Sequence, residues 1–114
     1  MDILKATVSH LAASLDGVRV SSEVPEKLTL PLVTVLRTGG GGDMFVDRPR
    51  MLVHAWGKTE AQALALARMA EDAMFSLPAA EANVADVTQD SLYSNVHPDG
   101  TRRWSGAYVI TTNR

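Results

Sequence analysis

Two aspartates and one histidine are the residues of this sequence whose types and spacing come nearest to a catalytic set. Asp43 and Asp47 lie beside a run of glycines, and His54 follows in the next apolar segment. Carboxylate oxygens are preferred ligands of Mg²⁺, so these three residues would suit a small metal-dependent nuclease. A usable Mg²⁺ site needs further oxygen ligands, and we identify none nearby. We therefore expect no metal and no cofactor, and we keep the nuclease as the lesser alternative.

The other histidines and acids do not form a catalytic pattern either. His10, His54 and His97 fall in a predicted helix, strand and turn, and the sequence has no G-x-S-x-G motif. The adjacent Glu71 and Asp72 fall on the polar face of a predicted helix. We expect His54 to lie on the surface of a sheet rather than to act as a base. We predict no catalytic residues and a protein that is not an enzyme.

The run Gly39–Gly42 is unusual between two predicted strands. Glycine-rich loops bind phosphate when a Lys-Ser or Lys-Thr pair follows at the start of a helix, and neither is present here. Because glycine loses much conformational entropy when it becomes ordered, we predict a mobile hairpin tip. Half of a loop of about twelve residues, extended at ~3.3 Å per residue, would reach roughly 20 Å from the body. Such an arm is suited to contact a neighbouring subunit.

Composition limits the classes of function. The chain has 114 residues, which suits one domain over 1–114, and a net charge of −2, which argues against nucleic-acid binding by bulk attraction. No apolar run approaches the ~20 residues of a membrane span, and no basic segment followed by an apolar block indicates a signal peptide. The sequence contains no cysteine, which fits the cytoplasm. We expect no membrane partner.

Hydrophobic periodicity predicts the elements that would position these residues. In order, these are a helix over 1–15, strands over 18–24, 32–38 and 51–56, a helix from Thr59 to the residue before Pro78, and strands over 84–93 and 102–112. We place the strand over 32–38 centrally, because both its faces are apolar. Because most of the strands are joined as hairpins, we expect an α+β fold with a mostly antiparallel sheet of about five strands and two helices packed on it. The order is α-β-β-β-α-β-β, with an extended Gly-rich hairpin arm.

The segment Pro49–Pro78 organises the chain as a strand, a tight turn and a long helix. Thr59 and Gln62 match a capping box, and Gly57 permits the turn before it. We expect the helix to end before Pro78. Its small and apolar residues recur at three- and four-residue spacing, which favours close packing on a sheet. This stripe comprises Ala63, Leu66, Ala67, Ala70, Ala73, Met74 and Leu77.

Several motifs occur in an order that resembles one known family. They are the N-terminal helix, PLVTVLR at 31–37, the glycine run, DRPR at 47–50, VHAWGKT at 53–59, PDG at 98–100 and RWSGAYVIT at 103–111. Together they cover nearly the whole chain, which resembles the tail terminator (tail completion) proteins of long-tailed bacteriophages and prophages. The same resemblance fits neighbouring neck components of similar size, so a head-completion or stopper protein is a second alternative.

The resemblance implies a structural protein of the virion. Such proteins form a ring, usually a hexamer, at the head-proximal end of the tail tube, and they assemble in the host cytoplasm. They end tube growth and present a surface to the head-tail connector or stopper. The implied partners are further copies of the chain, the tail tube protein, the connector, and DNA passing through the lumen.

The candidate interface residues fall into two groups. The segment 37–50 is the expected contact arm. Arg102 and Arg103 are candidates for a charged rim or lumen, or are two solvated arginines at a hairpin end. The full set is Arg37, Gly39, Gly40, Gly41, Gly42, Asp43, Phe45, Asp47, Arg48, Arg50, Arg102 and Arg103.

Overall fold

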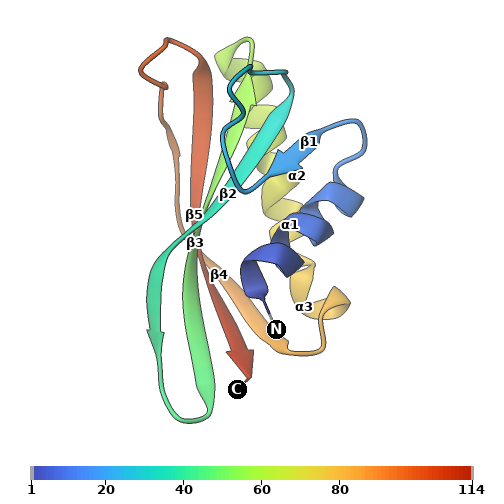
Figure 1. The fold of residues 1–114 in the computed structure, drawn as a ribbon, viewed down its shortest axis with the longest axis vertical. Helices are drawn as coiled ribbons and strands as arrows, with labels where there is room; N and C mark the ends of the chain where they lie inside the picture. Colours follow the sequence, from blue (N-terminus) through green and yellow to red (C-terminus); the bar gives the residue numbers. More distant parts are fainter. Residues whose placement is uncertain (1, 114) are drawn as a thin grey trace.

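Helices and strands follow the predicted order in the computed structural model of the chain, which describes residues 2–113 (Figure 1). The helices are α1 (Ile3–Ser14), α2 (Glu60–Phe75) and α3 (Leu77–Ala80). The strands are β1 (Arg19–Ser21), β2 (Leu32–Gly42), β3 (Val46–Gly57), β4 (Val84–Ser94) and β5 (Arg102–Asn113). Within residues 2–113, no helix has the length and apolar character needed to cross a bilayer.

The five strands form one sheet in the order β1-β2-β3-β5-β4. β1 pairs in parallel with the start of β2, and every other neighbouring pair is antiparallel. The predicted α+β fold with a mostly antiparallel sheet is therefore confirmed. Several details differ. The strand expected over 18–24 is only three residues long, and β3 rather than β2 is the central strand. β2 and β3 are longer than predicted, and the short helix α3 was not predicted.

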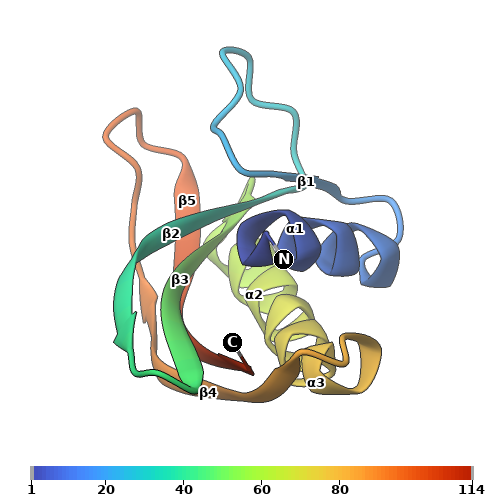
Figure 2. The same cartoon turned by 60° about the horizontal axis from the view of Figure 1, so that its bottom comes forward.

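The helices cover one face of the curved sheet (Figure 2). α2 begins as predicted, because the Thr59 side chain accepts a hydrogen bond from the backbone N–H of Gln62 at 3.2 Å. The alanine-rich stripe of α2 is buried, which lets the helix axis approach the sheet closely. At Gly57 an added Cβ would lie 2.6 Å from the backbone nitrogen of Ala63, so only glycine permits this approach of β3 to the first turn of α2.

The prediction that Pro78 ends the long helix is wrong. α2 ends at Phe75, and Pro78 lies in the first turn of the short helix α3, which begins at Leu77. The first turn of a helix tolerates proline, because the N–H that proline lacks has no partner within the helix there. The buried side chain of Leu77 still packs in the core.

The run Gly39–Gly42 is part of a strand, and the prediction that it forms a loop is wrong. The four glycines pair with residues 47–50 of β3 after a bulge between Arg37 and Gly39. Gly40 has φ +119°, and a Cβ there would collide with the carbonyl oxygen of Arg48. β5 continues beside β3 as far as Val46, so the hairpin belongs to the sheet and only its turn projects. The Gly-rich arm is thus an ordered strand pair.

Candidate functional site

The turn of the β2–β3 hairpin is built around one carboxylate. The Asp43 side chain accepts hydrogen bonds from the backbone N–H groups of Phe45, at 2.9 Å, and Val46, at 3.0 Å. The backbone N–H of Asp43 also donates to the carbonyl oxygen of Val46 at 2.8 Å. An aspartate that bonds to the backbone two residues ahead is a common way to stabilise a turn. The role of Asp43 in this structure is therefore to shape the hairpin turn.

This turn directs two large apolar side chains into solvent. Met44 is 79% exposed and Phe45 is 75% exposed, and no other large hydrophobic residue among 2–113 exceeds 49%. We call this pair the apolar tip. Phe45 belongs to the interface set predicted from the sequence, whereas Met44 does not. The position of Met44 beside Phe45 in the turn was the signal that could have identified it.

Along the hairpin, and from β3 across β5 to β4, arginines face aspartates at the surface. Nitrogen–oxygen distances are 3.8 Å for Arg37–Asp47, 3.8 Å for Arg48–Asp43 and 3.3 Å for Arg50–Asp90. Such exposed pairs contribute little to stability, on the order of 0–1 kcal/mol each. Two of these pairs lie within the predicted contact arm, so each of its aspartates has an arginine nearby.

The acidic residues considered for a nuclease lie apart from the histidine. His54 follows Asp47 by seven residues along β3, a separation of about 23 Å at ~3.3 Å per residue. Within residues 2–113, no group of three or more histidine, aspartate or glutamate side chains could hold a metal ion. The structure does not bring Asp43, Asp47 and His54 into one site.

His54 is buried, and the prediction that it lies on the sheet surface is wrong. Its side chain is 6% exposed, and its Nδ1 lies 2.6 Å from the hydroxyl oxygen of Ser105. Burial, which is the largest cause, acts together with electrostatic repulsion from Arg103 and His97 to lower the pKa of His54 to about 4. The imidazole is therefore neutral near pH 7. It is covered because the β4–β5 loop folds over this part of the sheet, away from the helices.

Arg103 lies over an aromatic ring in the same region. Its guanidinium carbon is 4.9 Å from the ring centroid of Trp56, whose indole N–H donates to the Thr34 hydroxyl at 3.0 Å. Trp56 also contacts two histidine rings, with centroid distances of 4.9 Å to His97 and 6.3 Å to His54. The Nε of Arg103 donates to the carbonyl oxygen of Asn95 at 3.1 Å. We call Thr34, Trp56, Asn95, His97 and Arg103, together with His54 and Ser105, the stacked cluster. We call the end of the sheet where this cluster lies the loop end.

A hydrogen bond to the Asp99 side chain stabilises the β4–β5 loop. The backbone N–H of Thr101 donates to the Asp99 carboxylate at 2.8 Å, and this bond is the largest of several interactions with Thr101 and His97 that lower the pKa of Asp99 to about 2. Arg102, in contrast with Arg103, is exposed at the start of β5. The two arginines predicted as one rim therefore have different environments, and only Arg102 is fully available to a partner.

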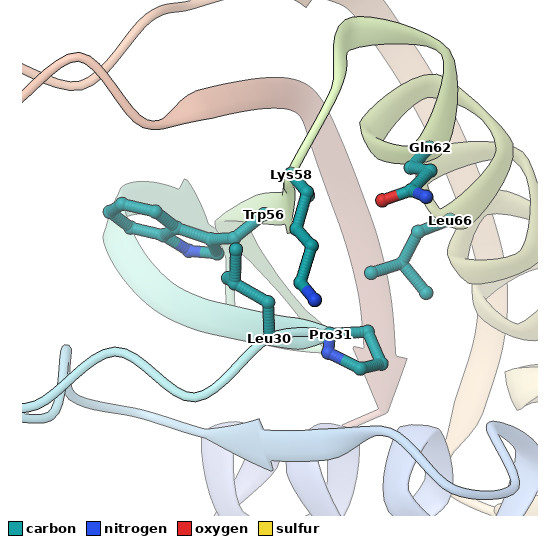
Figure 3. Close-up of a pocket in the computed structure, with 7 residues that line it drawn as sticks. Leu30, Pro31, Trp56, Lys58, Gln62 and Leu66 are labelled. Carbon is teal, nitrogen blue, oxygen red and sulfur yellow. The ribbon is translucent and has the colours of Figure 1, made fainter.

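A groove of about 350 Å³ opens at the loop end, where the segment leading into β2, the end of β3 and the start of α2 meet (Figure 3). In Figure 3 the Lys58 side chain extends between Leu30–Pro31 and Leu66, and Gln62 lies beside Leu66 on the helix. We call it the end groove. Its lining residues are Leu30, Pro31, Trp56, Gly57, Lys58, Gln62 and Leu66. The sequence offered no local signal for this groove, because three separate segments form it.

Comparison with known proteins identifies the fold but no family. No protein-family model matches the chain, and no curated protein matches it. Its structure is similar to a chain in the solved "Virion of native gene transfer agent (GTA) particle", with a TM-score of 0.65 and 14% sequence identity. The similarity covers 98% of this chain and 95% of that one. The two chains therefore share one fold over nearly their whole lengths.

Proposed function

We propose that this chain is a structural protein of a phage-like virion and that it acts there as a tail terminator. The observation that carries the proposal is the likeness over 98% of this chain and 95% of a chain from a gene transfer agent virion. The order of motifs along the sequence, from the N-terminal helix to the closing strand, supports the more specific role. On this proposal the protein resides at the neck end of the tail.

In that role copies of the chain form a ring, with six as the expected number, on the last layer of the tail tube. The ring ends tube growth and offers its other face to the connector or stopper, and DNA passes through its lumen. A closed ring requires heterologous contacts, in which one patch on a copy meets a different patch on the next. The apolar tip and the end groove are two different patches on one chain, which supports an assembly of this kind.

The test is the structure of particles made without this protein. Deletion of its gene should yield tails of abnormally great length that lack heads, seen by negative-stain electron microscopy. Expression of the wild-type chain from a plasmid should restore normal length. Tails of normal length without heads would contradict a terminator and favour a head-completion or stopper protein instead. Unchanged particles would overturn the virion role.

A further inference from the structure

We propose that the apolar tip of one copy binds in the end groove of the next copy, so that copies join head to tail. This inference adds a specific contact to the ring proposed above. It rests on that proposal for the assumption that the head-to-tail contacts close into a ring. It assigns a partner to the two most exposed large apolar side chains among residues 2–113, Met44 and Phe45.

The positions of the two surfaces favour contact between copies. The hairpin turn lies at one end of the long axis, whereas the starts of β2 and α2, beside which the groove opens, lie toward the other end (Figure 1). The molecule extends 43 Å along this axis, so the tip cannot reach the groove of its own chain. Two different surfaces at opposite ends generate a heterologous contact, which builds a ring when the rotation closes.

The chemistry of the groove matches that of the tip. Leu30, Pro31 and Leu66 provide apolar walls, and the Lys58 ammonium supplies a positive charge. The tip presents two apolar side chains directly after Asp43. A bound tip would bring this carboxylate, which keeps its turn hydrogen bonds and its 3.8 Å pair with Arg48, to the mouth of the groove near Lys58, where it would add charge complementarity to apolar burial.

The size of the groove suits a few side chains rather than a whole element. A volume of about 350 Å³ is at the lower end of the range for ligand pockets. An aromatic side chain buries about 150–250 Å², well below the roughly 1,600 Å² of a standard interface. A single tip contact is therefore weak. In a closed ring every copy both gives and receives a tip, so the contacts reinforce one another.

Pairing between sheet edges is a less favourable route to the same assembly. β2 has a bulge between Arg37 and Gly39, and β4 has two irregularities, between Val84 and Asp86 and between Gln89 and Ser91. Bulges twist an edge strand and interrupt its row of hydrogen-bonding groups, which hinders addition of another strand. Binding of the apolar tip in the end groove needs no such row of hydrogen-bonding groups.

Because the chain has no cysteine, disulfide trapping can test this contact without background. The test variant carries Met44→Cys and Gln62→Cys, which leaves Phe45 and Lys58 in place. Gln62 is exposed, and only its backbone takes part in the helix cap. The matched control carries Met44→Cys and Met69→Cys, because Met69 is 49% exposed farther along α2 and does not line the groove. Unfolding curves of the reduced variants should overlay that of the wild type.

Oxidation of assembled test variant should give a ladder of cross-linked species that ends at the ring size. Mixing the single variants Met44→Cys and Gln62→Cys should give a dimer that neither gives alone. The Met69 control should give several-fold less product. Equal cross-linking in the control, a dimer from Met44→Cys alone, or no cross-link at all would overturn the contact, as would trapping of the tip only on another virion protein.

The outcomes separate this contact from the proposed function. Over-long tails in the deletion strain without a 44–62 cross-link would retain the terminator and remove the tip-to-groove contact. A specific cross-link with unchanged tails would retain the contact and remove the terminator.

Discussion

At the loop end, the Arg103 guanidinium lies over the buried ring of Trp56, whereas at the hairpin end Arg37 and Arg48 pair with aspartates in solvent. The aromatic groups differ in the same way. Trp56 is fully buried and hydrogen-bonded to Thr34, and Phe45 is 75% exposed. Similar residue types thus stabilise the monomer at one end and remain available to a partner at the other.

This contrast has a physical basis in how each end is closed. At the loop end the β4–β5 loop folds over the sheet and excludes water from His54 and Trp56, so hydrogen bonds and ring contacts there act in a medium of low polarity. At the hairpin end nothing in residues 2–113 covers the turn, and the ion pairs remain in water, where they are weak. Substitutions at the two ends should therefore affect different measurements.

The largest expected effect is loss of stability on truncating Trp56. Trp56→Ala removes a fully buried ring and leaves Thr34 and Arg103 without their contacts, so the free energy of unfolding should fall by about 3–5 kcal/mol. Urea unfolding followed by circular dichroism measures this change. Tyr93→Ala is the control, because Tyr93 is 40% exposed and its loss should cost no more than about 0.5 kcal/mol. Equal losses would contradict a special contribution of the buried Trp56 ring to stability.

The next effect is a dependence of stability on pH that arises at His54. Its pKa is lowered from 6.5 to about 4 in the folded protein, so between these values the unfolded chain binds a proton that the folded chain excludes. The stability due to neutral His54 is complete above pH 6.5 and is lost as pH falls toward 4. The loss between pH 7 and pH 4.5 should be about 2–3 kcal/mol.

Comparison with a variant isolates this contribution from the other titrating groups. His54→Asn retains a polar partner for Ser105 and cannot titrate in this range. The variant should be less stable than the wild type at pH 7, and its stability should fall less steeply toward pH 4.5. Parallel pH profiles for the two proteins would show that His54 does not carry the effect.

A smaller effect is expected within the glycine strand. Gly40→Ala places a Cβ against the Arg48 carbonyl oxygen at a φ of +119°, so it should cost roughly 2 kcal/mol of unfolding free energy. Gly41→Ala is the matched control, because no atom lies within 4 Å of its added Cβ. That substitution should be neutral or slightly stabilising, since it restricts the unfolded chain. Similar melting temperatures for both variants would contradict the strand pairing described for this strip.

The smallest effect on stability is expected at Phe45. Because the side chain is 75% exposed, Phe45→Ala should change the free energy of unfolding by no more than about 0.5 kcal/mol. It should nevertheless raise the concentration needed for half-assembly on the order of tenfold, measured by analytical ultracentrifugation or by tail binding. Met69→Ala, which changes another exposed apolar residue, should leave the concentration for half-assembly unchanged. A large loss of stability at Phe45 would end the contrast with Trp56.

Features set by local sequence were predictable. The cap at Thr59 and the buried stripe of α2 follow from spacing alone, because a helix exposes one face per 3.6 residues. The inward face of β5 follows in the same way from the alternation that places Tyr108 and Ile110 together. These elements fixed the fold class.

Features set by distant segments were not predictable. The cost of ordering Gly39–Gly42 is offset by pairing with residues 47–50, which glycine content does not reveal. The face of His54 follows from strand alternation, but its burial depends on a loop more than forty residues later. The end groove requires β2, β3 and α2 to meet. Of the candidate site, the sequence therefore indicated the segment 37–50 and, by name, Phe45. It did not single out Met44 within that segment, and it did not indicate the groove.

The register of β3 and β5 also determines which part of the molecule tryptophan fluorescence reports on. The chain has two tryptophans, and they lie on adjacent strands near the loop end, where Trp56 pairs with Arg103 and Trp104 with Ala55. Tryptophan fluorescence therefore originates at that end alone, and fraying of the opposite hairpin should leave the tryptophan emission spectrum unchanged. Amide hydrogen exchange measured residue by residue would report on both ends of the sheet. A difference between the exchange rates and the fluorescence change would show how independently the two ends open.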